Sequence, residues 1–250
     1  MADTGNQQQA APARDMDAGV NEGVHKGTEP ASPAAQPDQA EQAPTADTDP
    51  GLRERVQKDA TPVSSTTQPR ENRHAVGWLD ITGTDILYPL VQGPDNTYYM
   101  THTFLRKKNA SGAIFMDCWN APDFTDFNTV IYGHNMKDGS MFAGLREYRF
   151  QAYFDAHPFV EITLLDRKLI YRVFAAYTVK EGETTDFRGQ GCVTELDRSQ
   201  FILAARKRST EIASRYAVSR NDRLLTLVTC AGGAQPWYWV VHAVLAGEEL

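Results

Sequence analysis

Two side chains of this sequence, Cys230 and His134, could together perform nucleophilic chemistry. Cys230 ends an apolar stretch that begins at residue 224, and a second apolar stretch begins at residue 237. Leu, β-branched and aromatic residues are typical of strands, whereas the Gly-Gly and Pro of residues 231–236 interrupt a strand ladder. A thiol fixed at a strand end can face a cleft and act as a nucleophile if an activating group lies nearby.

His134 directly follows another apolar stretch, residues 129–132, so an imidazole is also expected at a strand end. Such an imidazole could donate and accept the protons that nucleophilic chemistry requires. Taken alone, however, a histidine is more often a hydrogen-bonded structural residue, and a free cysteine is more often an inert core thiol. The other histidines have no comparable context, and we expect His242 in the final strand to be structural; the remaining ones are His25, His74, His102 and His157.

The charge and hydropathy of the chain exclude several classes of protein. A formal net charge of -7 and a pI near 5.4 argue against nucleic-acid binding, and the short basic cluster at 206–208 is expected to be a solvated helix face. The sequence has no apolar run of about 18 residues, and its first residues lack a signal-peptide pattern. We therefore expect membrane attachment only through an anchor that is absent from this chain.

The apolar residues are unevenly distributed along the 250 residues. Residues 1–55 are rich in Ala, Gln, Pro, Asp and Thr and cannot bury enough apolar surface to offset the entropy of ordering. We predict a disordered stalk or linker there, followed at 56–75 by an N-terminal extension, with a short helix over 51–60. Residues 76–250 have the size of one globular domain.

Within that domain, short apolar runs separated by turn residues predict a mainly antiparallel barrel or sandwich. The expected strands are residues 76–81, 86–91, 113–116, 129–132, 159–165, 169–179, 224–228 and 237–245. Helices are fewer and shorter: we expect one at 140–148 with Ser140 as its cap, another at 151–157, and a third that opens at a capping box beginning with Thr194.

Cys118 and Cys192 are the other two cysteines, and the sequence contains no Cys-x-x-Cys pair. A zinc site is therefore not expected, and nothing points to another metal or to an organic cofactor. The two thiols could form a disulfide, but two separate buried thiols are favoured.

Six sequence blocks, in this order over residues 75–245, resemble a class B sortase. The helix expected before Cys230 is also similar to the helical loop that class B sortases carry between their sixth and seventh strands. The blocks are Trp-Leu-Asp-Ile at 78–81, Tyr-Pro-Leu-Val-Gln-Gly at 88–93, Asp-Asn-Thr-Tyr-Tyr-Met at 95–100, Gly-Ala-Ile-Phe-Met-Asp at 112–117, Asn-Thr-Val-Ile-Tyr-Gly-His-Asn-Met-Lys-Asp-Gly-Ser-Met-Phe at 128–142, and Thr-Leu-Val-Thr-Cys at 226–230.

The resemblance implies a closed eight-stranded β-barrel with cysteine transpeptidase activity. Such enzymes cut a sorting signal of a surface or pilus protein after its threonine, hold the acyl fragment as a thioester, and transfer it to an amine of peptidoglycan or of a pilin. Cys230 matches the nucleophile and His134 the catalytic histidine. The resemblance also implies a location on the outer face of the membrane of a Gram-positive bacterium, with residues 1–55 as an extracellular stalk.

One position departs from the family. Relatives carry an arginine on the last strand, where this chain has Tyr238. A phenol donates one neutral hydrogen bond whereas a guanidinium donates charge-assisted ones, so we expect weaker stabilisation of the oxyanion. Either Tyr238 is a substitute donor or a packed aromatic, or an arginine such as Arg220 or Arg223 swings in, or the enzyme is attenuated.

The resemblance assigns substrate contacts to Asn96 and Met100, and we place Val228 and Thr229, beside the cysteine, in the same set. Val228 stands where some relatives have a small polar residue, and residues 182–185 do not match the family's substrate-lining positions. Two other classes remain open. A cysteine peptidase of another fold usually has its cysteine before its histidine, the reverse of this chain, and a sortase-like module could bind a peptide without turnover.

Overall fold

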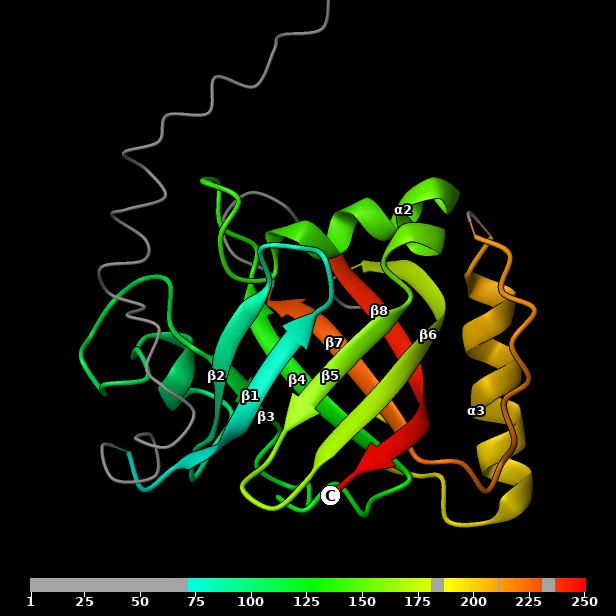
Figure 1. Cartoon of the computed structure of the whole chain (residues 1–250), viewed down its shortest axis with the longest axis horizontal. Helices are drawn as coiled ribbons and strands as arrows, with labels where there is room; N and C mark the ends of the chain where they lie inside the picture. Colours follow the sequence, from blue (N-terminus) through cyan, green and yellow to red (C-terminus); the bar gives the residue numbers. More distant parts are fainter. Residues whose placement is uncertain (1–71, 181–186, 211, 231–236) are drawn as a thin grey trace, which may run out of the picture. The chain divides into compact units, whose positions relative to one another are not determined.

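The computed structural model describes residues 72–180, 187–210, 212–230 and 237–250, and within them eight strands close into one barrel (Figure 1). The order around the barrel is β1-β2-β3-β4-β7-β8-β6-β5. This confirms the predicted closed, mainly β fold. The predicted stalk at 1–55, the helix at 51–60 and nearly all of the extension at 56–75 lie outside the described residues. The strands are β1 Ala75–Ile81, β2 Leu87–Gln92, β3 Ile114–Met116, β4 Asn128–His134, β5 Phe159–Thr163, β6 Lys168–Lys180, β7 Leu224–Cys230 and β8 Trp237–Glu249.

Most neighbouring strands pair antiparallel, but β2 with β3 and β4 with β7 pair parallel. A parallel pair requires a long crossover connection, and the described residues between β4 and β7 contain β5, β6 and three helices. The result is that the carboxyl ends of β4 and β7 lie at the same edge of the barrel wall. These are the two strand ends that carry His134 and Cys230.

Two apolar clusters lie on opposite faces of the barrel wall. The first fills the interior and receives side chains from every strand, for example Ile131 of β4 and Leu227 of β7. The second lies on the outside of β4, β7, β8 and β6, and contains Val130, Val228 and residues of the helix α3, Glu195–Arg208. Because strand residues alternate between faces, even-numbered positions of β4 and β7 belong to the outer face.

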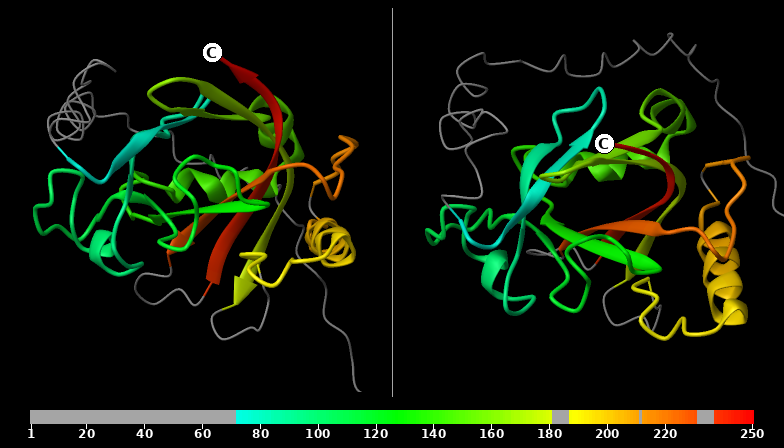
Figure 2. Two further views of the ribbon diagram at one scale, coloured as in Figure 1. Left: turned by 90° about the horizontal axis from the view of Figure 1, so that it is seen from below. Right: turned by 60° about the horizontal axis from the view of Figure 1, so that its bottom comes forward.

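The helices cover one end and one side of the barrel (Figures 1 and 2). Two helices lie across one end of the barrel: the 3-10 helix η3, Ala143–Arg149, and α2, Gln151–Ala156. The helix α3, Glu195–Arg208, follows β6 in the sequence and packs on the outside of the barrel wall. The predicted capping box of α3 is confirmed: Thr194 Oγ1 accepts from the Asp197 amide, and the Asp197 carboxylate accepts from the Thr194 amide. A further short 3-10 helix, η2, spans Tyr98–Met100.

The prediction of an α-helix over residues 140–148 is wrong in the residue at which the helix starts and in the type of helix. The helix is a 3-10 helix beginning at Ala143, its cap position is Phe142, and no side chain caps it. Ser140, the expected cap, instead hydrogen-bonds to the carboxylate of Asp138. Met141 adopts a φ of 58°, a left-handed conformation that cannot belong to a right-handed helix, so the helix starts after it.

The basic cluster at 206–208 is not simply a solvated face. Arg206 is half-buried, and its guanidinium donates to the carbonyls of Ser214 and Tyr216, so it holds the chain that leads from α3 towards β7. Cys118 and Cys192 are half-buried and are not joined to each other in a disulfide.

Candidate active site

The parallel pairing of β4 with β7 brings the two predicted catalytic positions together. Its register aligns Asn128 with Leu224 and ends with His134 opposite Cys230. Neighbouring strands lie about 4.8 Å apart, so the backbones of residues 134 and 230 are side by side although 96 positions separate them in the sequence.

The imidazole of His134 is held by a backbone carbonyl. It is half-buried, and its Nε2 lies 2.6 Å from the carbonyl oxygen of Met100 at the end of η2. A carbonyl can only accept, so Nε2 carries the proton in this bond, and in the neutral ring Nδ1 is left as the basic nitrogen. The contact fixes both the ring orientation and the tautomer.

Gly133, the residue before the histidine, allows β4 to pack closely at this point. A Cβ at position 133 would lie 2.5 Å from Ile114 Cδ1 and 2.7 Å from Phe142 Cγ. Both side chains are fully or almost fully buried, so they have little room to move. The amide of Phe142 also donates to the carbonyl of His134 at 2.9 Å, and this bond fixes the end of β4 further.

The other residues predicted near the cysteine occupy different environments. Thr229 is buried, and its hydroxyl accepts from the Trp239 amide at 2.8 Å, which ties the end of β7 to β8. Val228 is only 1% exposed within the outer cluster. Tyr238 is half-buried, packs against the same cluster and pairs through its backbone with Val179 of β6.

The predicted substrate contacts Asn96 and Met100 lie in the loop that contains η2. The side-chain oxygen of Asn96 accepts from the Cys118 amide at 2.8 Å, so Asn96 braces two loops. Met100 contacts His134 through its carbonyl, and its half-buried side chain packs on the outer cluster that includes Val228. The structure therefore brings Met100 together with His134.

Sequence reasoning missed a polar cluster on the outer face of β4, two residues before the histidine. The hydroxyl of Tyr132 donates to Asp117 Oδ2 at 2.8 Å and accepts from Arg188 Nε at 2.9 Å. Asp117 is 2% exposed. The burial of the Tyr132 hydroxyl and the neighbouring carboxylate of Asp117 raise the pKa of Tyr132 above its usual value. The cluster connects β4 to the segment before α3, and no local pattern could have predicted it because its members come from three distant parts of the chain.

A second buried network crosses the outer face below α3. Thr226 Oγ1 lies 2.7 Å from Asn128 Oδ1 and 2.8 Å from His242 Nδ1, while the other ring nitrogen of His242 lies 2.9 Å from the Tyr177 hydroxyl. Burial lowers the pKa of His242 to about 3, so its ring is neutral at physiological pH. A structural role for His242, as predicted, is consistent with these contacts.

Cys118 and the possible metal-ligand groups add no second centre in the described residues. Burial and the neighbouring Asp117 raise the pKa of the Cys118 thiol, which makes it a poor nucleophile at neutral pH. Across the described ranges, no group of three or more His, Cys, Asp or Glu side chains is arranged to hold a metal ion. In the same part of the chain, no helix combines the length and the apolar character needed to cross a membrane.

This arrangement suits acyl transfer through a cysteine. A thiolate attacks a carbonyl carbon, and an imidazole beside it can protonate the leaving amine. The positions of residues 134 and 230 at adjacent strand ends, with the His134 ring oriented by a carbonyl, provide the framework for that chemistry.

Comparison with known proteins agrees with this geometry. A family model described as the Sortase domain matches residues 79–246. Sortase B of Listeria monocytogenes is 40% identical over 162 residues, which are 64% of this chain and 63% of that protein. Sortase B of Staphylococcus aureus is 36% identical over 162 residues, 64% of each chain. The chain thus spans somewhat less than two thirds of the length of these curated relatives.

Solved structures give the same result. A Staphylococcus aureus sortase B–substrate complex superposes with a TM-score of 0.66 at 28% identity, covering 77% of this chain and 90% of the other. Sortase B from Listeria monocytogenes superposes with a TM-score of 0.62 at 35% identity, and the match covers 70% of this chain and 97% of the Listeria chain. The match of the family model over most of the barrel, together with these relatives, shows that this chain belongs to the sortase family and is of the class B type.

Proposed function

We propose that this chain is a cysteine transpeptidase that cleaves the sorting signal of a surface or pilus protein and transfers the acyl fragment to an amine. The pairing of His134 with Cys230 across two parallel strands is the observation that carries the proposal. Membership of the sortase family supports it, because a sortase barrel with a histidine and a cysteine at these strand ends has the parts for thioester chemistry.

The reaction would proceed in two halves. The Cys230 thiolate attacks the carbonyl carbon of the scissile peptide bond, the C–N bond breaks, and the amine leaves with a proton donated by the His134 imidazolium. The resulting thioester is then attacked by the acceptor amine, which gives up a proton to His134 as the C–S bond breaks and the thiolate is restored. A thioester thus divides one amide exchange into two easier steps.

The strand register supports a role for residues of both β7 and β8. Because strand positions alternate, we expect position 230 to fall on the outer face with Val228 and His134. The β7–β8 pairing ends at Val228 with Val240, and continuing its register by two residues would place Tyr238 opposite position 230. We therefore keep Tyr238 as the candidate donor to the oxyanion, where relatives have an arginine.

The two arginines considered as replacements are poorly placed. Arg223 precedes β7, and its guanidinium pairs with Glu248 at 2.9 Å. Arg220 pairs with Glu195 at 2.8 Å, at the start of α3. A seven-residue strand is about 23 Å long, which an arginine side chain cannot span to reach the other end of β7. We therefore reject both arginines as substitutes for the family's arginine.

The proposed partners follow from the same assignment. The peptide partner is the sorting signal, cut after its threonine; one related Staphylococcus aureus structure is described as a sortase B–substrate complex. Of the four predicted contacts, Asn96 and Met100 are half-buried and are kept as direct contacts, whereas Val228 and Thr229 are each 1% exposed and would support the site from below the surface. The acceptor is an amine of a cell-wall peptide or a pilin lysine. We place the barrel on the outer face of a Gram-positive cell membrane.

Incubation of the full chain with sorting peptides and an amine tests the proposal. Mass spectrometry should detect a thioester on Cys230 and the new amide product, and both should disappear in Cys230→Ala. His134→Ala should greatly reduce both. Cys118→Ala is the matched control, since its thiol has a raised pKa and should not be required.

The alternatives give different products. Hydrolysed peptide without amine capture would favour a cysteine peptidase, and peptide binding without an adduct would favour a sortase-like binding module. Tyr238→Phe tests the oxyanion donor: loss of one such donor costs on the order of a hundredfold in rate, and an unchanged rate would exclude the phenol. A higher rate in Tyr238→Arg would identify the natural chain as attenuated.

A further inference from the structure

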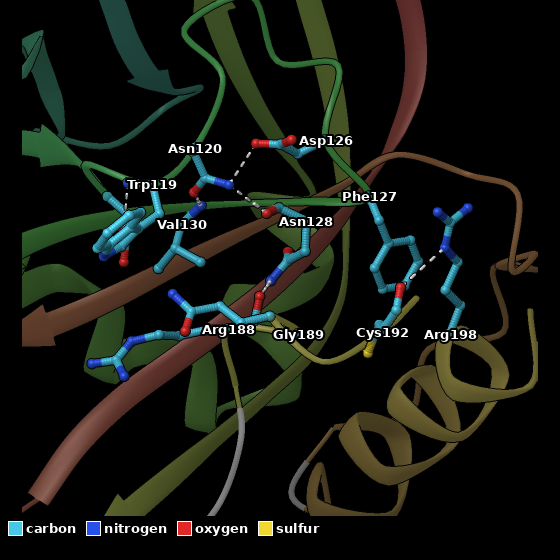
Figure 3. Close-up of a pocket in the computed structure, with 12 residues that line it drawn as sticks. Trp119, Asn120, Asp126, Phe127, Asn128, Val130, Arg188, Gly189, Cys192 and Arg198 are labelled. Carbon is cyan, nitrogen blue, oxygen red and sulfur yellow. Dashed lines mark hydrogen bonds between the residues drawn. The ribbon is translucent and has the colours of Figure 1, made fainter. Parts of the chain in front are cut away.

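A polar pocket lies on the outer face of the barrel, away from the proposed catalytic pair (Figure 3). It has a volume of about 490 Å³, and its floor includes Asn128 and Val130 at the beginning of β4. Figure 3 shows Trp119 on one side and Phe127 with Arg198 on the other. None of the residues proposed for catalysis lines this pocket.

The pocket lies in line with the catalytic position along β4. Val130 is four residues and Asn128 six residues before His134, and all three are on the outer face. At about 3.3 Å per strand residue, these positions lie roughly 13 and 20 Å from the histidine. A donor peptide that extends parallel to β4 has nearly the same rise per residue, so its fourth to sixth residue from the reacting bond would reach the pocket.

The acidic groups of the pocket are already engaged by the protein. Asp117 accepts from the Tyr132 hydroxyl and from the Trp119 amide. Asp126 Oδ2 accepts from the Asn120 side chain and from the Ala121 amide, both at 2.7 Å. A basic ligand would therefore have to compete with donors that are built into the fold.

The cationic groups are at the wall of the pocket. Arg198 projects from α3, stacks 5.1 Å over the ring of Phe127 and donates its Nε to the Cys192 carbonyl. Arg188 is exposed and is oriented by its bond to Tyr132. A guanidinium binds a carboxylate through charge-assisted, forked hydrogen bonds, so an acidic side chain complements this wall.

Trp119 adds a flat apolar surface at the rim. Its side chain is 82% exposed, which is unusual for the largest aromatic residue. Its backbone amide is fixed by Asp117, so the indole is carried by an ordered turn. Exposed tryptophans of this kind are common contact residues for peptides, since they bury a large area with little loss of side-chain freedom.

We propose that this pocket is a second binding subsite for the donor peptide, which takes an acidic side chain four to six residues from the reacting bond. The inference rests on the proposed transpeptidase function, because that function supplies the peptide. Arg198 and Trp119 would be specificity-determining residues, and Arg188, held by Tyr132 and Asp117, would connect the subsite to the catalytic strand.

The test uses the full chain and matched peptides. Each peptide carries the same sorting motif, extended by six residues on either its N-terminal or its C-terminal side, with Glu or Gln at the fourth to sixth position. The Glu peptide should have a KM about fivefold lower than the Gln peptide, the effect of one partly exposed ion pair, with an unchanged kcat. The two extensions reveal on which side of the bond the subsite acts.

Variants assign the effect to the pocket. In Arg198→Gln the ratio of the Gln-peptide KM to the Glu-peptide KM should fall from about five to about one, and in Trp119→Ala both extended peptides should bind more weakly. Arg220→Gln is the matched control: Arg220 is an exposed arginine that pairs with Glu195 outside the pocket, so this variant should keep the fivefold ratio. Direct binding of the same peptides to Cys230→Ala should show the same preference without turnover.

Some results would overturn the subsite. Equal KM for Glu and Gln peptides with both extensions, while the unextended peptide still forms the Cys230 thioester, would reject the pocket and leave the proposed function intact. A change in the KM of the amine acceptor alone would also reject it, since the pocket would then bind the other substrate. Absence of the thioester with every peptide, together with preferential binding of Glu peptides to Cys230→Ala, would reject the proposed function but not the subsite.

Discussion

Replacing Gly133 with alanine should disturb the end of β4 and, through it, the catalytic pair. The added Cβ would lie 2.5 Å from Ile114 Cδ1 and 2.7 Å from Phe142 Cγ, whereas carbon atoms normally approach to about 3.5–4.0 Å. Ile114 could relax by a change of rotamer, but the ring of Phe142 is rigid and 0% exposed. The strand must therefore shift by about an ångström, or the ring must move.

The expected cost is that of an overpacked core, about 1–3 kcal/mol. For a domain of this size, a loss of 1 kcal/mol lowers Tm by about 2–4 °C, so we expect a decrease of roughly 2–12 °C in thermal denaturation. Thioester formation should fall by more than the unfolded fraction explains, because His134 is the next residue and its bond to Met100 requires the native strand position.

Two variants control this prediction. Gly191→Ala adds the same methyl group where no atom lies within 4 Å, so its Tm should be unchanged. Ile114→Val in the Gly133→Ala background removes one of the contacting atoms and should cost less than the sum of the two single changes. A Gly133→Ala protein with the wild-type Tm and the wild-type rate of acylation would refute the reasoning.

Three further changes should have defined effects. Thr229→Val removes the acceptor of the Trp239 amide and should lower the free energy of unfolding by about 1–2 kcal/mol in urea denaturation; an unchanged midpoint would contradict it. Thr194→Ala removes the α3 cap and should cost about 1 kcal/mol in the same measurement, whereas a neutral effect would mean that α3 frays without consequence. His242 has a pKa of about 3 when folded and near 6.5 when unfolded, so the unfolded chain binds the extra proton as pH falls. The contribution of His242 to the free energy of unfolding should be complete above pH 6.5 and should decrease towards pH 3 by up to about 1.4 kcal/mol per pH unit. The variant His242→Asn should lack this part of the pH dependence.

Local features of the fold could be predicted from the sequence because they depend on nearby residues. The strands followed from short apolar runs, and α3 followed from the Thr194 capping box and the apolar residues after it. The 3-10 helix η3 could not be predicted in detail. Its start depends on the left-handed conformation of Met141 and on the bond between Ser140 and Asp138, and both of these belong to a tight turn rather than to a helical pattern.

The candidate site, like the fold, has features that could be predicted from the sequence and features that could not. Cys230 and His134 could be selected from their strand-end contexts and from the resemblance, but their alignment depends on a parallel pairing between distant segments. The positions of Arg220 and Arg223 could not be predicted either, because their distance from the site depends on which end of β7 they flank. Likewise, the cluster of Tyr132, Asp117 and Arg188 exists only after the chain has folded.

The place of β7 and β8 in the barrel has a consequence for synthesis on the ribosome. These two strands fill the gap between β4 and β6, and they are the last strands to be made. A nascent chain that has reached the end of β6 has two unpaired strand edges and a histidine with no thiol beside it. Neither closure of the wall nor assembly of the reactive pair is possible before β7 is made, so a chain that ends after β6 is prone to edge association but has no acyl-transfer chemistry.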